Sequence, residues 1–448
     1  MKIENFKTIL LVNLIVISLF LTYNLWTYQP NSNISQNTKD IQDIPDAAKK
    51  DVANLVLPSR LIVHQENSKH LASEQISDIN MVYKVIERGE FRDLRDKSNE
   101  YARNQSFLSL VHGKNKMEFV FSTEVPLDVM KSIFSIKEKE TGSYSFDRMV
   151  IDLAESRDDN ILTYFVSQDD KKVYQMTLKG LSLKEVENAR DQFATNAREY
   201  FMYAVNESRT IFLPETSTSM QRTFYVTSEL QEDVLKNTLF TDPRYVKQDK
   251  TEVGETYTDG TRLLSIPKTK QTLSYVNSSV IDNEHLTGTP LVQRSIDFIN
   301  THGGWTDSDR LYLINPRQGE TVFRLYQESL PVFNGDGMAT LKQKWGIDDL
   351  STYKRPLFKL LLKKEDDTKV ELPSGREIIS FLENNPNANM KQIKDIQFGY
   401  EMESELGANS GKVSVVKLEP IWYITYENES KKIQWNMITG RGEIVGLE

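Results

Sequence analysis

Few residues of this chain have the types and spacing that chemistry needs. Its five histidines are His64, His70, His112, His285 and His302, and none stands in H-E-x-x-H or another metal-ligand spacing. The sequence holds no G-x-S-x-G elbow, no phosphate-binding G-x-x-x-x-G-K-[ST] and no G-x-G-x-x-G. A Ser–His–Asp triad assembles in space, so spacing alone does not test for one. The sequence therefore predicts no catalytic residue, no metal ligand and no cofactor.

Three short segments resemble functional motifs, but each predicts local structure instead. His302-Gly303-Gly304 resembles half of an oxyanion motif, yet its position after a helical run predicts a glycine C-cap. Residues 306–309 open like a calcium loop, but Tyr312 falls where glycine is needed and Gln318 where the bidentate glutamate is needed, so we predict an ordinary loop. Glu365-Asp366-Asp367 predicts a solvated hairpin tip, with weak cation binding as the alternative.

The element that organises the chain is the apolar segment Thr8–Tyr28. Its 21 residues include no Asp, Glu, Lys, Arg or His. A helix of this length spans about 30 Å, the thickness of a bilayer's hydrocarbon core. Lys2 and Lys7 precede it, and the next basic residue is Lys39. Positive charge on the N-terminal side predicts that residues 1–7 are a cytoplasmic stub, that residues 8–28 cross the cell membrane once, and that residues 29–448 are extracytoplasmic.

The alternative reading of this segment is a cleaved signal peptide. Such a peptide has an apolar region of about 7–15 residues followed by a small-x-small cleavage site. The apolar run here is longer, and LTYNLWTYQP contains no such site. Tyr23, Trp26 and Tyr28 suit the outer aromatic belt of a membrane, as Lys2 and Lys7 suit its inner interface. These features favour a retained anchor in contact with the lipid bilayer.

Two amides interrupt the anchor and define one side of it. Asn13 and Asn24 are eleven residues apart, about three helical turns, so they share a face with Ile17 and Phe20. An amide in hydrocarbon seeks a hydrogen-bond partner, often on another helix. We therefore predict that Asn13, Ile17, Phe20 and Asn24 bind a partner helix. The alternative is that Asn24 is interfacial and Asn13 bonds locally.

Composition excludes several classes of protein. The chain has 448 residues, 39% of them hydrophobic, which supports packed cores. It contains no cysteine, so disulfides, thiolate nucleophiles and Cys-zinc sites are excluded. The formal net charge is -9 and no basic stripe occurs, so we predict no nucleic-acid binding.

The residues beyond the anchor divide by composition into a tether and three domains. Residues 29–50 are polar and read as a tether. Residues 51–213 and 214–305 each mix helix and strand signals and are predicted as α+β domains. Residues 306–448 carry many short strands and predict a mostly antiparallel β-meander or partly open barrel. The predicted fold class is α+β.

Six segments give helix signals, among them the apolar spacing of Ile79 to Ile86 before Gly89 and the start at Pro126, and one segment gives a clear hairpin signal. Ser182 with Glu185 forms a capping box, and apolar residues at helical spacing continue to Ala204. Ser228 with Gln231 predicts a further helix, Thr289-Pro290 another that ends at Gly303, and Ser374 with Glu377 another. Asp259-Gly260 between two alternating runs predicts a β-hairpin.

Three sequence features resemble one known family. KTILL followed by LTYNLWTYQP marks the anchor and its junction, FRLYQESLPVFN occupies residues 323–334, and LEPIWYITY occupies residues 418–426. With one anchor, a tether and three domains in this order, the chain resembles the YycH family of Gram-positive bacteria over its whole length. The last two motifs look like that family's C-terminal strand motifs.

The resemblance implies a function in signalling. Members of the family are single-pass accessory proteins of an essential two-component system that governs cell-wall metabolism. The implied partners are a sensor histidine kinase of the WalK/YycG type and a single-pass protein of the YycI type, which shares the fold of the C-terminal domain. The family has no described catalytic residues to carry over, and some members restrain the kinase while others activate it.

The residues themselves support the same class of function. A cytoplasmic stub of seven residues has no domain with which to signal, so any effect inside the cell must pass through another membrane protein. We therefore predict a non-enzymatic, membrane-anchored regulator that shifts the populations of two kinase states by contact. Two alternatives stay open: a binding module for a small ligand or wall fragment, and an anchored cell-wall hydrolase with two facing carboxylates.

Overall fold

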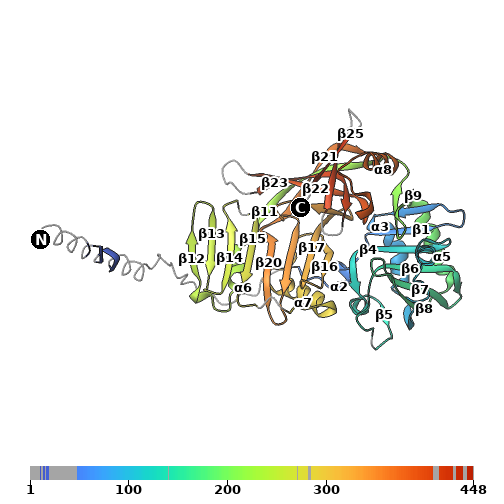
Figure 1. Ribbon diagram of the computed structural model, residues 1–448, viewed down its shortest axis with the longest axis horizontal. Coiled ribbons are helices and arrows are strands. Elements are labelled where there is room, and N and C mark those ends of the chain that lie inside the picture. The colour runs from blue at the N-terminus through green and yellow to red at the C-terminus, as the bar shows by residue number, and fades with distance from the viewer. Residues whose placement is uncertain are drawn as a thin grey trace.

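Two large β-sheets with helices on their faces make up the folded part of the chain (Figure 1). The structure is a computed structural model. It describes residues 48–139, 141–269, 271–280, 284–406, 413–426, 430–436 and 441–446, together with Leu11, Leu14, Ile15 and residues 17–19. The sheet-rich α+β class predicted from the sequence is confirmed.

Sheet one has ten strands in the order β10-β9-β2-β1-β4-β6-β7-β8-β3-β5. The pairs are antiparallel except β3 with β5. The strands are β1 Arg60–His64, β2 His70–Ser73, β3 Glu90–Asp96, β4 Lys116–Pro126, β5 Ser135–Ile136, β6 Ser145–Arg157, β7 Asn160–Ser167, β8 Lys172–Lys179, β9 Arg198–Asn206 and β10 Arg209–Pro214.

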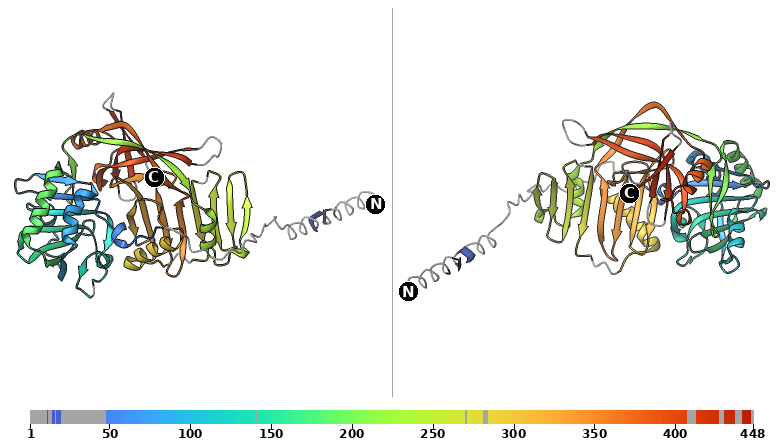
Figure 2. Two further views of the ribbon diagram at one scale, coloured as in Figure 1. Left: turned by 180° about the vertical axis from the view of Figure 1, so that it is seen from behind. Right: turned by 45° about the horizontal axis from the view of Figure 1, so that its top comes forward.

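Helices cover both faces of sheet one. α3 (Ile76–Ile86) and α5 (Leu183–Asn196) pack side by side on one face, where alternate residues of β1, β4 and β6 point into the main apolar core (Figure 2). α4 (Asn104–His112) lies on the other face and buries Phe107, Leu110 and Val111 against β6, β7 and β8. The short α2 (Val52–Leu55) and the 3-10 helix η1 (Leu127–Ser132) add to the main core.

Sheet two has fifteen strands, of which twelve follow the order β12-β13-β14-β15-β20-β19-β17-β18-β22-β23-β11-β21. Strand β16 pairs with β17, and β24 links β23 to β25. The strands are β11 Thr218–Glu229, β12 Lys247–Lys250, β13 Gly254–Thr258, β14 Arg262–Pro267, β15 Thr272–Asn277, β16 Asp309–Asn315, β17 Glu320–Gln327, β18 Leu330–Phe333, β19 Thr340–Trp345, β20 Leu350–Pro356, β21 Phe358–Leu372, β22 Asp395–Leu406, β23 Val413–Thr425, β24 Ser430–Asn436 and β25 Arg441–Gly446.

The helices of sheet two mostly begin and end where the sequence signals lie. α7 (Gly288–Thr301) follows the predicted Thr-Pro start and ends at the predicted glycines, and α8 (Gly375–Glu383) has the complete capping box of Ser374 and Glu377. α6 is Glu232–Leu239, and the 3-10 helices η2 and η3 are Pro243–Tyr245 and Met390–Gln392. The hairpin at Asp259-Gly260 joins β13 to β14 as predicted.

Three local predictions are wrong. The helix that starts at Ser182 ends at Asn196 rather than near Ala204, because residues 198–206 form β9, which pairs with both β2 and β10. Ser228 lies in β11 and pairs with Lys359, so α6 starts without a side-chain cap. Glu365-Asp366-Asp367 lies inside β21, beside a register shift in its pairing with β11, and is therefore not a hairpin tip.

Strands from the predicted second and third domains share sheet two. β15 pairs with β20, and β11 lies between β21 and β23. The change of sheet falls between β10, which ends at Pro214, and β11, which starts at Thr218. The β-meander predicted for the C-terminal part is present as β22, β23, β24 and β25 in antiparallel succession.

The glycine C-cap of α7 provides a test of the local packing. Gly303 has a φ of +96°, and an added Cβ would lie 2.7 Å from Leu235 Cδ2 and 3.0 Å from Arg355 Nη1. We expect Gly303→Ala to lower the free energy of unfolding by more than about 1 kcal/mol, since alanine disfavours this φ. Gly180→Ala is the matched control, because Gly180 has a φ of +81° with nothing within 4 Å. Equal losses in chemical denaturation would contradict the steric part of this expectation.

Candidate functional site

The predicted membrane residues lie mostly outside the described part of the chain. Of the predicted partner-binding face, Ile17 is helical with 53% of its surface exposed, whereas Asn13, Phe20 and Asn24 are outside the described residues. The predicted interface residues Lys2, Lys7, Tyr23, Trp26 and Tyr28 are outside them as well. Among the described residues, no helix has both the length and the apolar character to cross a bilayer. The anchor therefore stays a prediction from the sequence.

The last residues of the predicted tether, Ala48 to Lys50, bond to α7 and to the loop before β16 before the chain enters sheet one. Lys50 donates its backbone N–H to Asn300 Oδ1 at 3.0 Å, and Asn300 Nδ2 donates back to the Lys50 carbonyl at 3.1 Å. The Trp305 indole donates to the same Asn300 oxygen at 2.7 Å, and its backbone N–H bonds to the Ala48 carbonyl at 3.2 Å. We call Ala48, Lys50, Asn300, Trp305 and Asp307 the Lys50 site.

The side chain of Lys50 occupies the loop that resembles a calcium site in sequence. Its Nζ donates to the carbonyls of Asp307 at 2.6 Å and Asp309 at 3.3 Å, and it lies 5.4 Å from the centre of the Trp305 ring. Burial lowers the pKa of Lys50, and the neighbouring aspartates partly offset that shift. Residues 306–308 form a loop before β16, as predicted, and the Lys50 ammonium group lies against the backbone carbonyls of Asp307 and Asp309.

A cavity opens beside the Lys50 site. Its volume is about 270 Å³, and its lining combines aromatic groups (Trp305, Tyr225, Tyr326) with polar ones, including Asp307 and Gln327. Tyr225 and Gln327 are joined by a hydrogen bond of 2.8 Å. Aromatic walls with a few convergent polar groups are the usual composition of a small-ligand site.

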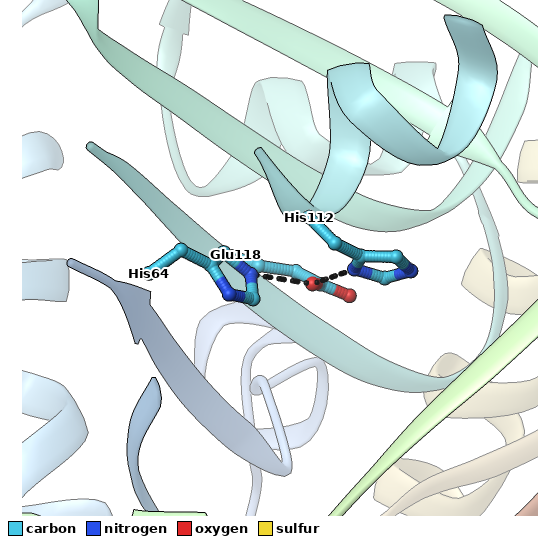
Figure 3. Close-up of side chains that lie close together, drawn as sticks. All are labelled: His64, His112 and Glu118. Carbon is cyan, nitrogen blue, oxygen red and sulfur yellow. Dashed lines mark hydrogen bonds and ion pairs between the residues drawn. The ribbon is translucent and has the colours of Figure 1, made fainter. Parts of the chain in front are cut away.

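The most concentrated ionisable chemistry lies in sheet one, where His64 and His112 meet Glu118 (Figure 3) and a third histidine, His70, contacts His64. His64 Nε2 is 3.1 Å and His112 Nδ1 is 2.8 Å from the same oxygen of Glu118, Oε2. His70 Nδ1 is 2.8 Å from His64 Nδ1. The side chains of His64, His112 and Glu118 are 1%, 5% and 2% exposed, so bulk water does not compete for these contacts.

Each member of this histidine cluster is positioned by a different element. His64 ends β1 and pairs with His70 of β2 on one side and Lys116 of β4 on the other. Glu118 lies two residues further along β4, so its side chain points to the same face as Lys116. His112 is the last residue of α4, which crosses that face. Phe212 of β10 packs its ring 5.0–5.2 Å from all three imidazole rings.

Buried charges around the cluster come in pairs. Arg148 Nε is 2.9 Å from Glu118 Oε1, a close ion pair although the N–H is not aligned for a hydrogen bond, and Arg148 also pairs with Asp147 at 2.7 Å. Lys116 pairs with Asp152. Burial raises the pKa of Glu118, but His112, His64 and Arg148 outweigh it and hold that pKa well below its usual range. Burial lowers the pKa of His64 and lowers that of His70 to about 4.

The sequence did not reveal this cluster. The spacings 64, 70, 112 and 118 match no metal motif, because the hairpin β1–β2, the end of α4 and β4 bring these residues together only in the folded chain. The sequence held two weak signals. A histidine lies at each end of the turn that joins β1 to β2, and the alternation of side chains along β4 places Glu118 on the face opposite to the apolar core residues of that strand. The other two histidines, His285 and His302, lie outside the cluster.

Comparison with known proteins gives both a fold and a family. The crystal structure of YycH from Bacillus subtilis matches with a TM-score of 0.71 and 20% sequence identity, covering 86% of this chain and 98% of that one. The two-component system WalR/WalK regulatory protein YycH of Bacillus subtilis strain 168 is 23% identical over the full length of both chains. The chain is therefore of the sheet-rich α+β class that the YycH structure represents.

Family models make the relationship specific. The YycH protein N-terminal domain matches residues 4–195, and the YycH protein C-terminal domain matches residues 208–440. The chain belongs to the YycH family, as the three sequence features indicated. The gap between the two matches, residues 196–207, contains β9, so the C-terminal match begins just before β10, the last strand of sheet one along the chain.

The carboxyl group of Asp307 at the Lys50 site predicts a pH dependence of stability. Burial, and then Asp309, raises the pKa of Asp307 from 3.8 to about 6. The folded state therefore holds this proton more tightly than the unfolded state. The contribution of the protonated Asp307 carboxyl group to the free energy of unfolding is present below pH 3.8 and is lost as the pH rises through 6.

We expect Asp307→Asn to remove this loss while keeping an oxygen for the Leu360 N–H. In thermal unfolding, the Tm of the variant relative to the unchanged chain should rise between pH 4 and pH 7. Asp336→Asn, at an exposed turn, is the control. A Tm difference that stays constant with pH, or falls, would contradict the expectation.

Proposed function

We propose that this chain is a non-enzymatic, membrane-anchored regulator of a sensor histidine kinase of the WalK/YycG type. Membership of the YycH family supports this proposal, as does the name of the Bacillus subtilis relative, a regulatory protein of the WalR/WalK two-component system. We also propose a single membrane crossing by residues 8–28, three extracytoplasmic domains with the boundaries given above, and a YycI-type protein as a second partner.

The observation that carries the proposal is the Lys50 site. A regulator with a short cytoplasmic stub acts by changing how its membrane helix or its outer domains contact a partner. The Lys50 site ties residues 48–50 to the end of α7 and the start of β16 by five hydrogen bonds of 2.6–3.3 Å. A rearrangement of sheet two is thereby coupled to the position of the tether.

The size of the required effect is modest. A partner that binds two kinase states with a difference of about 1–3 kcal/mol changes their ratio about 5–150-fold. Each neutral hydrogen bond of the Lys50 site is worth about 0.5–1.5 kcal/mol. The summed free energy of the hydrogen bonds in the Lys50 site is therefore comparable to the difference in binding free energy between the two kinase states.

The cavity beside the Lys50 site favours a second function, ligand sensing. Occupation of about 270 Å³ next to Trp305 and Asp307 would act directly on the groups that hold Lys50. A small amphipathic molecule fits its aromatic and polar lining. Asp307 is the one carboxylate of that lining, so the cavity gives no support to glycoside hydrolysis by two facing carboxylates.

Replacing Asn300 tests the coupling. Asn300→Ala removes three hydrogen bonds of the Lys50 site, and we expect it to change kinase output severalfold while the protein still co-purifies with the kinase. Gln293→Ala, on the exposed face of the same helix, is the control. Output would be read from a promoter controlled by the response regulator. Identical output from Asn300→Ala and the unchanged chain would refute coupling through this site.

Replacing the anchor amides tests the contact within the membrane. We expect the double substitution Asn13→Leu with Asn24→Leu to leave the protein in the membrane, because leucine is more apolar, and to reduce co-purification with the kinase by the loss of interhelical hydrogen bonds of about 0.6–2 kcal/mol each. Membrane fractionation checks the first expectation, and pull-down from detergent extracts checks the second. Undiminished pull-down would show that this face is incidental to partner binding.

A further inference from the structure

The geometry of His64, His112 and Glu118 points to a site for a divalent transition metal in sheet one, and we propose that these three side chains bind one zinc-like cation. A set of two imidazole nitrogens and one carboxylate oxygen binds such ions in preference to Mg²⁺ or Ca²⁺, which favour oxygen ligands alone. The three ligand atoms lie within 4.8 Å of one another in a pocket closed to bulk water.

The distances suit a metal centre after a small adjustment. Ligand atoms 2.0–2.1 Å from a tetrahedral ion are separated by about 3.3 Å. The two nitrogen–oxygen separations here are 2.8 and 3.1 Å, so each would lengthen by a few tenths of an ångström as the ion replaces the shared protons. Binding thus exchanges two N–H···O hydrogen bonds for metal bonds, and the proton of each neutral imidazole moves to its other ring nitrogen. The fourth coordination position is left to water or another ligand.

The surroundings supply the outer contacts that metal sites use. A metal on Nε2 of His64 fixes the proton of that ring on Nδ1, which then donates to His70 Nδ1 across the observed 2.8 Å. Arg148 holds the second oxygen of Glu118 at 2.9 Å and orients the carboxylate. The charge of Arg148 is balanced by Asp147 and that of Lys116 by Asp152, so Glu118 is the carboxylate left to face the cation.

A competing arrangement uses the same side chains without a metal. Neutral His64 and His112 each donate one N–H to Glu118, and His70 donates to His64. In both arrangements His112 Nε2 has no hydrogen-bond partner among the described residues, so that nitrogen does not decide between them. Metal binding decides between them directly.

The position of the site gives a bound metal a structural consequence. It would join the end of α4 to β1 and β4, which are already hydrogen-bonded neighbours in sheet one. Phe212 packs on all three histidines, and its carbonyl accepts a hydrogen bond of 3.0 Å from Arg60, which pairs with Asp395 of sheet two. Occupancy therefore acts on the contact between the two sheets.

Zinc binding to the full-length protein in detergent tests the proposal. The protein is first stripped with EDTA and dialysed. On addition of ZnCl₂ we expect saturable binding in calorimetry and a rise in Tm, and elemental analysis after removal of unbound zinc should give one zinc per chain. Co²⁺ should give the visible absorption of a tetrahedral N/O site. His64→Gln and His112→Asn place an amide N–H near the lost imidazole N–H, so each keeps a hydrogen bond to Glu118 but loses a ligand atom. We expect each to weaken zinc binding at least tenfold.

Two further variants sharpen the result. His70→Ala, which removes the outer contact of His64, should weaken zinc binding about 10–100-fold. His285→Gln, outside the cluster, should bind zinc as the unchanged chain does. Circular dichroism without metal verifies that each variant is folded. An unchanged chain that binds no zinc, or variants at His64 and His112 that bind it equally well, would overturn the proposal. Neither outcome would bear on kinase regulation, which is tested by the anchor and Asn300 variants.

Discussion

A single apolar core runs through both sheets, and the arrangement of the whole molecule depends on it. The main cluster of buried residues includes side chains of α3, α5 and β4 in sheet one and of α7, β14 and β20 in sheet two. α2, η1 and β16 lie where the two parts meet. Because the chain contains no cysteine, this burial and the polar contacts at its edge are what hold the sheets together.

Specific polar contacts also join the two sheets at that junction. Arg60 pairs with Asp395, Lys394 pairs with Asp169, and the Ser122 and Tyr326 hydroxyls lie 3.0 Å apart. Arg60 and Asp395 are largely buried, so removing one partner would leave an uncompensated charge. The histidine cluster lies at the opposite end of β1 from Arg60, and Trp305 of the Lys50 site belongs to the shared core. A change in the packing of the two sheets would therefore alter the surroundings of both candidate sites.

The sequence predicted those elements whose signals are local. The capping boxes at Ser182 and Ser374, the Thr-Pro start and glycine end of α7 and the Asp259-Gly260 hairpin follow from short-range chemistry and are present. The predictions failed where pairing between distant strands overrode a local pattern. Residues 198–206 have helical spacing but fill the place between β2 and β10, and three acidic residues expected at a turn lie in the middle of β21. The histidine cluster could not be predicted for the same reason, since four segments build it.

The path of the chain between the two sheets has a topological consequence. The chain contacts sheet two at Ala48–Lys50, then forms the whole of sheet one, and returns to sheet two at Thr218. Sheet one is thus an insertion whose two ends are both attached to the same body. A pull on the chain at Ala48 would therefore load the contacts of Lys50 with α7 before it reached sheet one.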